Sequence, residues 1–149
     1  MPKSIVIVES PAKAKTLEKF LGSEFRVLAS YGHVRDLPRK GLGVDRKHSY
    51  QPTYEILQGK EKTIQDLRKA TRDAPFVYLA ADPDREGEAI SWHLQETLRP
   101  SARSAVFKRV RFNEITRHAV LQAMEDAGEI DSRLVDAQQA RRIIDRLVG

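Results

Sequence analysis

The sequence predicts an α/β fold with a mostly parallel sheet and helices on both faces. Short apolar runs of strand length alternate with segments of helical periodicity. Two of these runs also end in residues that start a helix, as in "VESPAK" at residues 8–13. Because the strands are expected to be parallel, their carboxyl ends meet at one edge of the sheet, where such folds bind ligands.

The first strand and helix are predicted by residues 4–22. Residues 4–8, "SIVIV", are largely β-branched and typical of a buried strand. Ser10 suits the N-cap of the following helix, and Pro11 suits its first position, where a missing N–H costs nothing. Gly22 ends this helix. Residues 25–33 then predict a second strand that leads into a loop.

The middle of the chain is less regular. Residues 36–59 are rich in proline, glycine and charge and have no sustained period, so we expect an irregular excursion with one short strand at residues 54–57. Residues 60–73 predict a surface helix. Residues 75–81 predict the clearest buried strand, and residues 86–98 predict the helix that follows it.

The last third predicts a strand at residues 104–112, a helix at 113–128 and a final helix at 131–149. We expect one domain over residues 1–128, while residues 129–149 begin the next domain. A chain that stops on an apolar helix predicts an excised fragment of a longer protein. The apolar stripe expected on the final helix contains Leu134, Ala137, Ile144 and Leu147 or Val148.

Composition restricts the possible partners. The net charge is +5, with 26 Lys and Arg against 21 Asp and Glu, which favours attraction to polyanions such as nucleic acid. Because there are no cysteines, disulfides and thiolate metal sites are excluded, and a metal would need oxygen or histidine ligands. That ligand set favours Mg²⁺. With no apolar run long enough for a bilayer and no cleavable signal, we expect a cytoplasmic protein without a membrane partner.

One acidic stretch runs against this positive charge. The segment "LAADPDREGEAISWHL", residues 79–94, follows a predicted strand and carries Asp82, Asp84, Glu86 and Glu88. Pro83 favours an extended backbone at Asp82, so the side chains of Asp82 and Asp84 can converge. Alternatively, Asp82 is the N-cap of the next helix and the other acids complement the helix dipole.

Converging carboxylates need a positive partner. Two of them about 4 Å apart repel by roughly 4 kcal/mol at an effective dielectric constant of 20. A divalent cation would offset this repulsion, and so would a nearby Lys13, Lys15 or Arg85. Glu9 adds a further acid, because it directly follows the first strand. In a parallel sheet, Glu9 and Asp82 would lie at the same edge, although Glu9 could simply favour the start of its helix.

Five motifs resemble a known family. They are "VIVESPAKAKT" (6–16), "GHVRDLP" (32–38), "DPDREGEAISWHL" (82–94), "VRFNEIT" (110–116) and "LVDAQQARRIIDRLVG" (134–149). Together and in this order, they resemble the N-terminal part of the bacterial type IA DNA topoisomerases, the topoisomerase I family. The resemblance covers essentially the whole chain and implies a Rossmann-like Toprim domain over residues 1–128.

The resemblance implies roles for individual residues. Glu9 corresponds to the Toprim glutamate, proposed as the general acid for the leaving 3′-oxygen, and Lys13 corresponds to the lysine near the cleaved phosphate. His33 is a weaker candidate for support of the site. The acids expected to bind Mg²⁺ are Asp82, Asp84 and Glu86.

At the end of the chain, Arg141 and Asp145 correspond to a DNA-contacting pair, with Arg141 counted among the catalytic residues. The alternative without a function is a surface ion pair between these two residues, which are four positions apart, worth only about 0.3 to 0.5 kcal/mol. His33 could likewise be a packed loop histidine.

The family breaks and reseals one DNA strand through a tyrosine that lies far downstream of this region. None of Tyr31, Tyr50, Tyr54 and Tyr78 lies in that motif. The chain is therefore expected to lack the nucleophile and to be inactive alone. Its expected partners are a single-stranded segment of negatively supercoiled DNA in the nucleoid and the remainder of the topoisomerase.

Two other functions stay open on the sequence. One is a different Toprim enzyme, a Mg²⁺-dependent nuclease or a primase-like polymerase. The other is a non-catalytic basic module that binds DNA through lysine and arginine, with the acids in structural roles.

Overall fold

The structure of the protein is a computed structural model that describes residues 3–36, 44–45, 51–52 and 54–148. Much of the excursion expected at residues 36–59, including Tyr50, therefore lies outside the described residues. Within the described parts of that segment, two short antiparallel pairs form. Strand β3 (Arg35–Asp36) pairs with β6 (Glu55–Ile56), and β4 (Val44–Asp45) pairs with β5 (Gln51–Pro52). Strand β6 falls inside the strand expected at residues 54–57.

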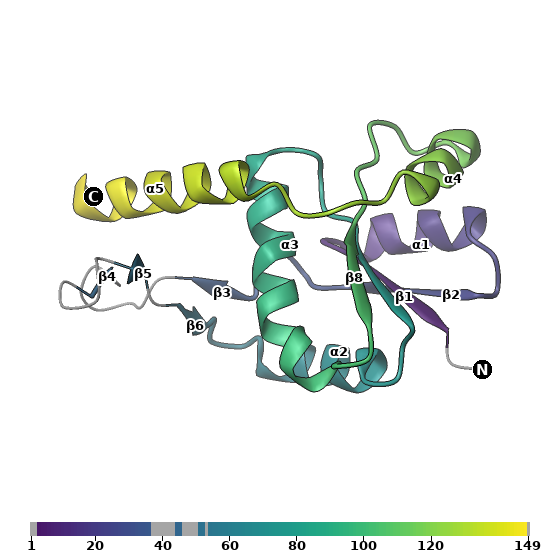
Figure 1. Ribbon diagram of the computed structural model, residues 1–149, viewed down its shortest axis with the longest axis horizontal. Coiled ribbons are helices and arrows are strands. Elements are labelled where there is room, and N and C mark those ends of the chain that lie inside the picture. Colours follow the sequence, from purple (N-terminus) through teal and green to yellow (C-terminus); the bar gives the residue numbers. More distant parts are fainter. Residues whose placement is uncertain (1–2, 37–43, 46–50, 53, 149) are drawn as a thin grey trace.

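A four-stranded parallel sheet forms the centre of the fold, as predicted (Figure 1). Its strands, in spatial order, are β2 (Phe25–Ala29), β1 (Ser4–Val8), β7 (Phe76–Leu79) and β8 (Val106–Arg109). Every neighbouring pair is parallel. The carboxyl ends of β1 and β7 therefore lie next to each other.

Helices cover both faces of this sheet, which confirms the α/β prediction (Figure 1). Helices α1 (Pro11–Phe20) and α4 (Arg117–Glu125) pack on one face, and α2 (Glu61–Thr71) and α3 (Arg85–Leu98) on the other. A short 3-10 helix, η2 (Arg99–Ser101), follows α3.

The alternation of side chains along the strands divides the core in two. Strand β1 shows this most clearly. Ile5 and Ile7 pack in the cluster that contains α2 and α3, whereas Val6 and Val8 pack in the cluster that contains α1 and α4. Because both faces of the strand are buried, its sequence is continuously apolar rather than alternating.

Capping side chains mark the starts of α1, α3 and α4. The Ser10 hydroxyl accepts a hydrogen bond from the Lys13 backbone N–H at 3.2 Å, which confirms the predicted N-cap of α1. The cap of α3 is Asp84, whose Oδ1 accepts from the Gly87 N–H at 2.7 Å, so the alternative that placed Asp82 at this position is wrong. Thr116 caps α4. That helix therefore begins at Arg117 rather than in the stretch expected from residue 113.

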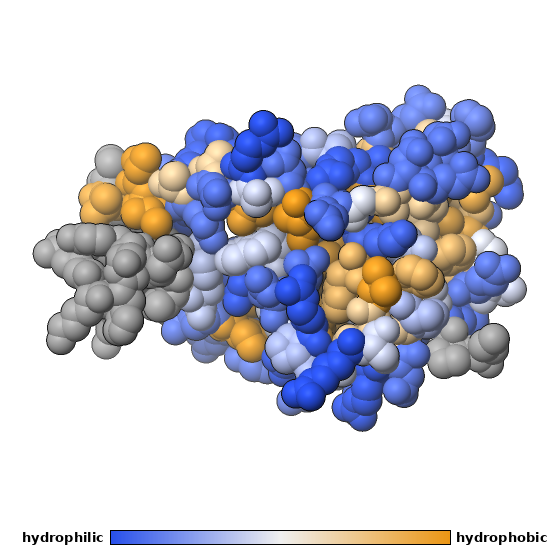
Figure 2. Space-filling model, viewed as in Figure 1, coloured by the Kyte–Doolittle hydropathy of each residue, from blue (hydrophilic) through white to orange (hydrophobic). Residues whose placement is uncertain are grey.

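The final helix, α5 (Ser132–Val148), crosses α3 and continues beyond the sheet (Figure 1). The far end of the apolar stripe expected on it is exposed. Val135 is the residue that packs, at 3% exposure, whereas Ile144 and Leu147 are 57% and 61% exposed. Figure 2 shows the end of α5 as an apolar patch. The reason is that α3 lies only under the first part of α5. No helix in the described residues is long and apolar enough to cross a membrane.

Candidate active site

Glu9 and Asp82 meet at the carboxyl edge of the sheet. Glu9 follows β1 and Asp82 lies three residues after β7, and these two strands are neighbours. The backbone N–H of Asp82 donates a hydrogen bond to Glu9 Oε2 at 2.8 Å. Parallel pairing thus joins two acidic residues that are 73 positions apart in the sequence.

Lys13 lies between these two carboxylates. Its Nζ is 3.1 Å from Glu9 Oε1 and 2.8 Å from Asp82 Oδ1. The first turn of α1, capped by Ser10, brings the lysine to this position. The hydrogen bond from Lys13 holds the pKa of Asp82 below its ordinary value, although partial burial opposes this shift. A protein cation therefore offsets the like-charge repulsion expected at this edge.

The other two predicted metal ligands face different partners. Asp84 caps α3 through Oδ1, and Glu86 Oε1 lies 3.1 Å from His33 Nε2. In the part of the chain that the structure describes, no three acidic or histidine side chains gather closely enough to hold a metal ion. The donor type still fits Mg²⁺, because Asp82, Asp84 and Glu86 are exposed and offer hard carboxylate oxygens.

Gly87 lets the first turn of α3 lie directly against the acidic residues. A Cβ atom at this position would be 1.8 Å from the carbonyl oxygen of Asp82. Only glycine avoids that clash without a backbone shift. The last position of the "DPDREG" pattern therefore requires glycine for a steric reason, independent of the charges before it.

We call the carboxyl edge of the sheet with Glu9, Asp82, Asp84 and Glu86 the exposed edge. The fourth acid of the stretch, Glu88, does not belong to it. Its side chain is fully buried and pairs with Arg109 at 2.7 Å and with Arg111 at 2.8 Å. These arginines were not identified as site residues from the sequence. A signal was present, because arginine at the end of a buried strand needs an acidic partner.

Arg141 and Asp145 are exposed on α5. Within the described residues, they form no salt bridge with each other and no hydrogen bond with Glu9, Lys13 or Asp82. The structure therefore does not bring them into the acidic edge, and the surface ion pair considered as an alternative is not formed. The neighbouring Arg142 instead pairs with Asp36 of β3, at 2.6 Å between Nη2 and Oδ2.

A cluster of aromatic and basic side chains lies beside the edge. The Arg35 guanidinium lies over the rings of Tyr54 and Trp92, and its Nε donates to Nδ1 of His93 at 2.6 Å. Burial lowers the pKa of His93 to about 3, so this imidazole is neutral at pH 7. A cavity of about 310 Å³ extends from His33 and Glu86 along this cluster to α5.

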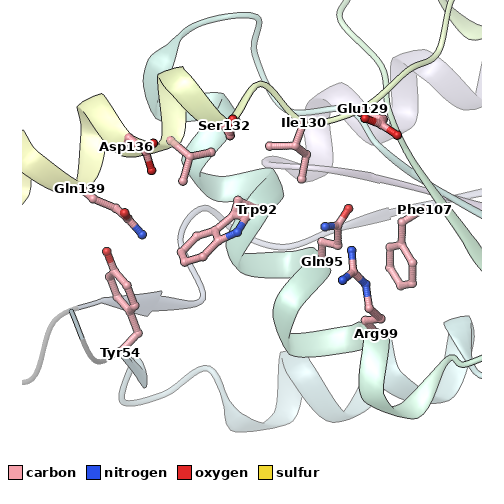
Figure 3. A pocket seen from close by; sticks show the side chains of 11 residues that line it. Tyr54, Trp92, Gln95, Arg99, Phe107, Glu129, Ile130, Ser132, Asp136 and Gln139 are labelled. Carbon is pink, nitrogen blue, oxygen red and sulfur yellow. The ribbon is translucent and has the colours of Figure 1, made fainter. Parts of the chain in front are cut away.

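A larger cavity of about 630 Å³ lies between α3 and α5 (Figure 3). Trp92 and Tyr54 project into it from one side, and Gln139 and Asp136 of α5 from the other (Figure 3). It lies away from Glu9 and Lys13, neither of which lines it.

Comparison with known proteins shows the family of this chain. The Toprim domain family model matches residues 4–115. The full-length topoisomerase I from Thermotoga maritima has 41% sequence identity with this chain and superimposes with a TM-score of 0.85. The match covers 97% of this chain but 24% of the Thermotoga protein, so the chain spans about a quarter of that topoisomerase. These matches confirm the resemblance to bacterial topoisomerase I, and the chain belongs to the Toprim domain family.

Proposed function

We propose that this chain is the Toprim part of a type IA DNA topoisomerase, which relaxes negatively supercoiled DNA by transient cleavage of one strand. The observation that carries the proposal is the direct contact of Glu9 with Asp82, with Lys13 between them. This contact supports the proposal because it joins an acid, a cation and exposed carboxylate oxygens at one edge of the sheet. The net charge of +5 favours binding of the DNA polyanion.

In this proposal, Glu9 is the general acid. Attack on phosphorus breaks the bond to the 3′-oxygen, and the departing oxygen takes a proton. Glu9 is positioned for this role, because its carboxyl group is only 18% exposed and is oriented by Lys13 and the Asp82 N–H. Both contacts are donors to its oxygens, so Glu9 would first take up a proton from solvent when the DNA phosphate draws Lys13 away, and would then pass that proton to the 3′-oxygen. Lys13 is suited to stabilise the negative charge that grows on the phosphate oxygens.

Asp82, Asp84 and Glu86 would hold a Mg²⁺ ion. Asp82 and Asp84 each use one side-chain oxygen in the described hydrogen bonds, to Lys13 and to Gly87, and Glu86 uses one toward His33. The second oxygen of each acid is therefore available as a ligand. When bound, the ion would neutralise phosphate charge and help to orient the DNA.

The nucleophile belongs to another part of the longer protein. Tyr54 packs against Trp92 and His93, Tyr78 lies in β7, and Tyr31 is exposed with Lys60 near its ring. None of these hydroxyls has a hydrogen bond to Glu9 or Lys13 in the described residues. We propose that the isolated chain does not cleave DNA, and that Arg141, Asp145 and His33 contact DNA only in the complete enzyme.

A chimera tests this function. The chain replaces the matching quarter of the Thermotoga topoisomerase, and relaxation of negatively supercoiled plasmid is measured with and without Mg²⁺. We expect Mg²⁺-dependent relaxation that falls by roughly 10²- to 10⁴-fold in Glu9→Ala. The control is Glu18→Ala, because Glu18 is exposed on α1 and should not affect the rate.

Unchanged relaxation in Glu9→Ala would refute the role of that residue. Mg²⁺-dependent hydrolysis or nucleotide transfer by the 149 residues alone would favour a nuclease or primase-like enzyme instead. DNA binding that is indifferent to Mg²⁺, in a chimera that never relaxes plasmid, would favour the non-catalytic module.

A further inference from the structure

We propose that Arg109 and Glu88 are positioning residues for the acidic loop, defined as residues 80–84. In this role they fix the peptide of Asp82, and through it the direction in which the Asp82 carboxylate points. The metal-binding part of the inference rests on the proposed function, whereas the positioning part does not.

Arg109 holds the carbonyl groups at the end of β7. Its Nη1 donates to the carbonyl oxygens of Leu79 at 3.0 Å and Ala81 at 2.7 Å, and its Nη2 donates to that of Asp82 at 2.6 Å. These three acceptors lie where β7 leaves the sheet and the acidic loop begins. Nη1 also donates to the carbonyl oxygen of Val110 at 2.7 Å, so the several donors of this one arginine fork join the acidic loop to the end of β8.

Glu88 holds the guanidinium in place. Its Oε1 accepts from Nε of Arg109 at 2.7 Å and from Nε of Arg111 at 2.9 Å. Its Oε2 accepts from Nη2 of Arg111 at 2.8 Å and from the Asp131 N–H at 2.9 Å. Four donors saturate this fully buried carboxylate, so its orientation is fixed.

A purely stabilising role explains this network poorly. Buried ion pairs are often no more stabilising than well-packed apolar side chains of similar volume. An apolar residue at position 109 could fill the space, but it could not bind the carbonyls of the acidic loop. The feature that requires an arginine is therefore the hold on the loop.

The Asp82 peptide is consequently held from both sides. Glu9 accepts its N–H, Arg109 binds its C=O, and the Gly87 backbone lies close against that carbonyl oxygen. With the peptide planes on both sides of its Cα held, the Asp82 side chain leaves the backbone in one direction, toward Lys13. The same network also holds the start of α5, because Glu88 accepts the Asp131 N–H.

The test compares Arg109→Lys with Arg111→Lys in the 149-residue chain. Both variants keep a positive charge and both disturb Glu88, but only the first removes the hold on the acidic loop. The first readout is the backbone NMR order parameter of Asp82. We expect it to fall from about 0.85 to below about 0.6 in Arg109→Lys, with Val6 in β1 unchanged. In Arg111→Lys, Asp82 should stay rigid.

The second readout is Mn²⁺ affinity, measured from paramagnetic broadening. We expect Arg109→Lys to weaken binding by about 10- to 100-fold, as is typical of residues that orient metal ligands, and Arg111→Lys to bind like the unchanged protein. Equal effects of the two variants on Asp82 would overturn the positioning role. Failure of the unchanged protein to bind Mn²⁺ would overturn the proposed metal site, and the order parameter would still decide the positioning role.

Discussion

Two acidic regions at the start of α3 show how differently the fold uses the same side chains. Glu86 belongs to the exposed edge, with a side chain that is 64% exposed and faces His33. Glu88, two residues later, is fully buried against Arg109 and Arg111. Two residues turn a helix by about 200°, which places these neighbours on opposite sides of α3. Charge in the sequence alone therefore does not tell a binding acid from a structural one.

The difference lies in how many oxygen positions are already used. Glu88 has four donors and no access to solvent, so it can bind nothing further. The acids of the exposed edge have fewer partners, and Lys13 is shared between Glu9 and Asp82. We infer that the carboxylates of the exposed edge can exchange their hydrogen-bond partners for a ligand, whereas Glu88 keeps its partners.

The largest effect on stability is expected at the buried Glu88. Glu88→Ala leaves the Arg109 charge buried without its partner, so we expect a loss of about 3 to 5 kcal/mol in the free energy of unfolding, measured with urea. Glu86→Ala is the matched control and should change it by less than about 0.5 kcal/mol. Similar losses in both variants would remove the distinction between the two regions.

The next effect tests the contact between α3 and the acidic loop. Gly87→Ala places a Cβ atom against the Asp82 carbonyl, and we expect a loss of about 1 to 3 kcal/mol in thermal or urea unfolding. Gly22→Ala is the control, because a Cβ there meets no atom within 4 Å. If Gly87→Ala were as stable as the control, the close approach would not be required.

Buried His93 gives a pH-dependent comparison. Its pKa is lowered from 6.5 to about 3 in the folded protein. Between pH 6.5 and about pH 3, this histidine is therefore protonated in the unfolded chain but not in the folded one. Stability should therefore fall as the pH falls through this window, by up to about 1.4 kcal/mol per pH unit from this group. His93→Gln should flatten the profile measured by urea unfolding, and the exposed His118→Gln should not. An unchanged slope in His93→Gln would contradict the burial argument.

The smallest effect on stability is expected at the exposed edge. Lys13→Met removes the hydrogen bond that lowers the pKa of Asp82, so this pKa should rise in an NMR titration. The contribution of that lowered pKa is present above the ordinary carboxyl pKa and lost as the pH falls through the folded value. At pH 7 we expect a change of less than about 1 kcal/mol, because Asp82 is 61% exposed. Lys15→Met, on the exposed side of α1, should leave the Asp82 titration unchanged.

Much of the fold follows from the sequence because strand and helix signals are local. Ser10 and the apolar run before it were sufficient to place β1 and α1. Parallel pairing then predicted that Glu9 would lie beside Asp82, and the two are in contact. Asp84 was harder to assign, since an acid after a strand suits both a cap and a metal ligand.

The rest depended on contacts that no local pattern contains. Glu88 and Arg109 are 21 residues apart, and only the packing of α3 against the end of β8 shows that they are partners. The apolar stripe of α5 likewise did not show which of its residues pack, since α3 lies only at the start of this helix, near Val135 (Figure 1). The division between domains at residue 128 stays a prediction.

The most direct test of the exposed edge is the position of a bound divalent ion in the unchanged protein. Mn²⁺, which replaces Mg²⁺ and broadens nearby NMR signals, is titrated into the isotope-labelled chain. We predict that the backbone signals of Glu9, Asp82, Asp84 and Glu86 broaden first. Broadening centred on other residues, or none at all, would contradict the assignment of this edge as the reactive part of the Toprim domain.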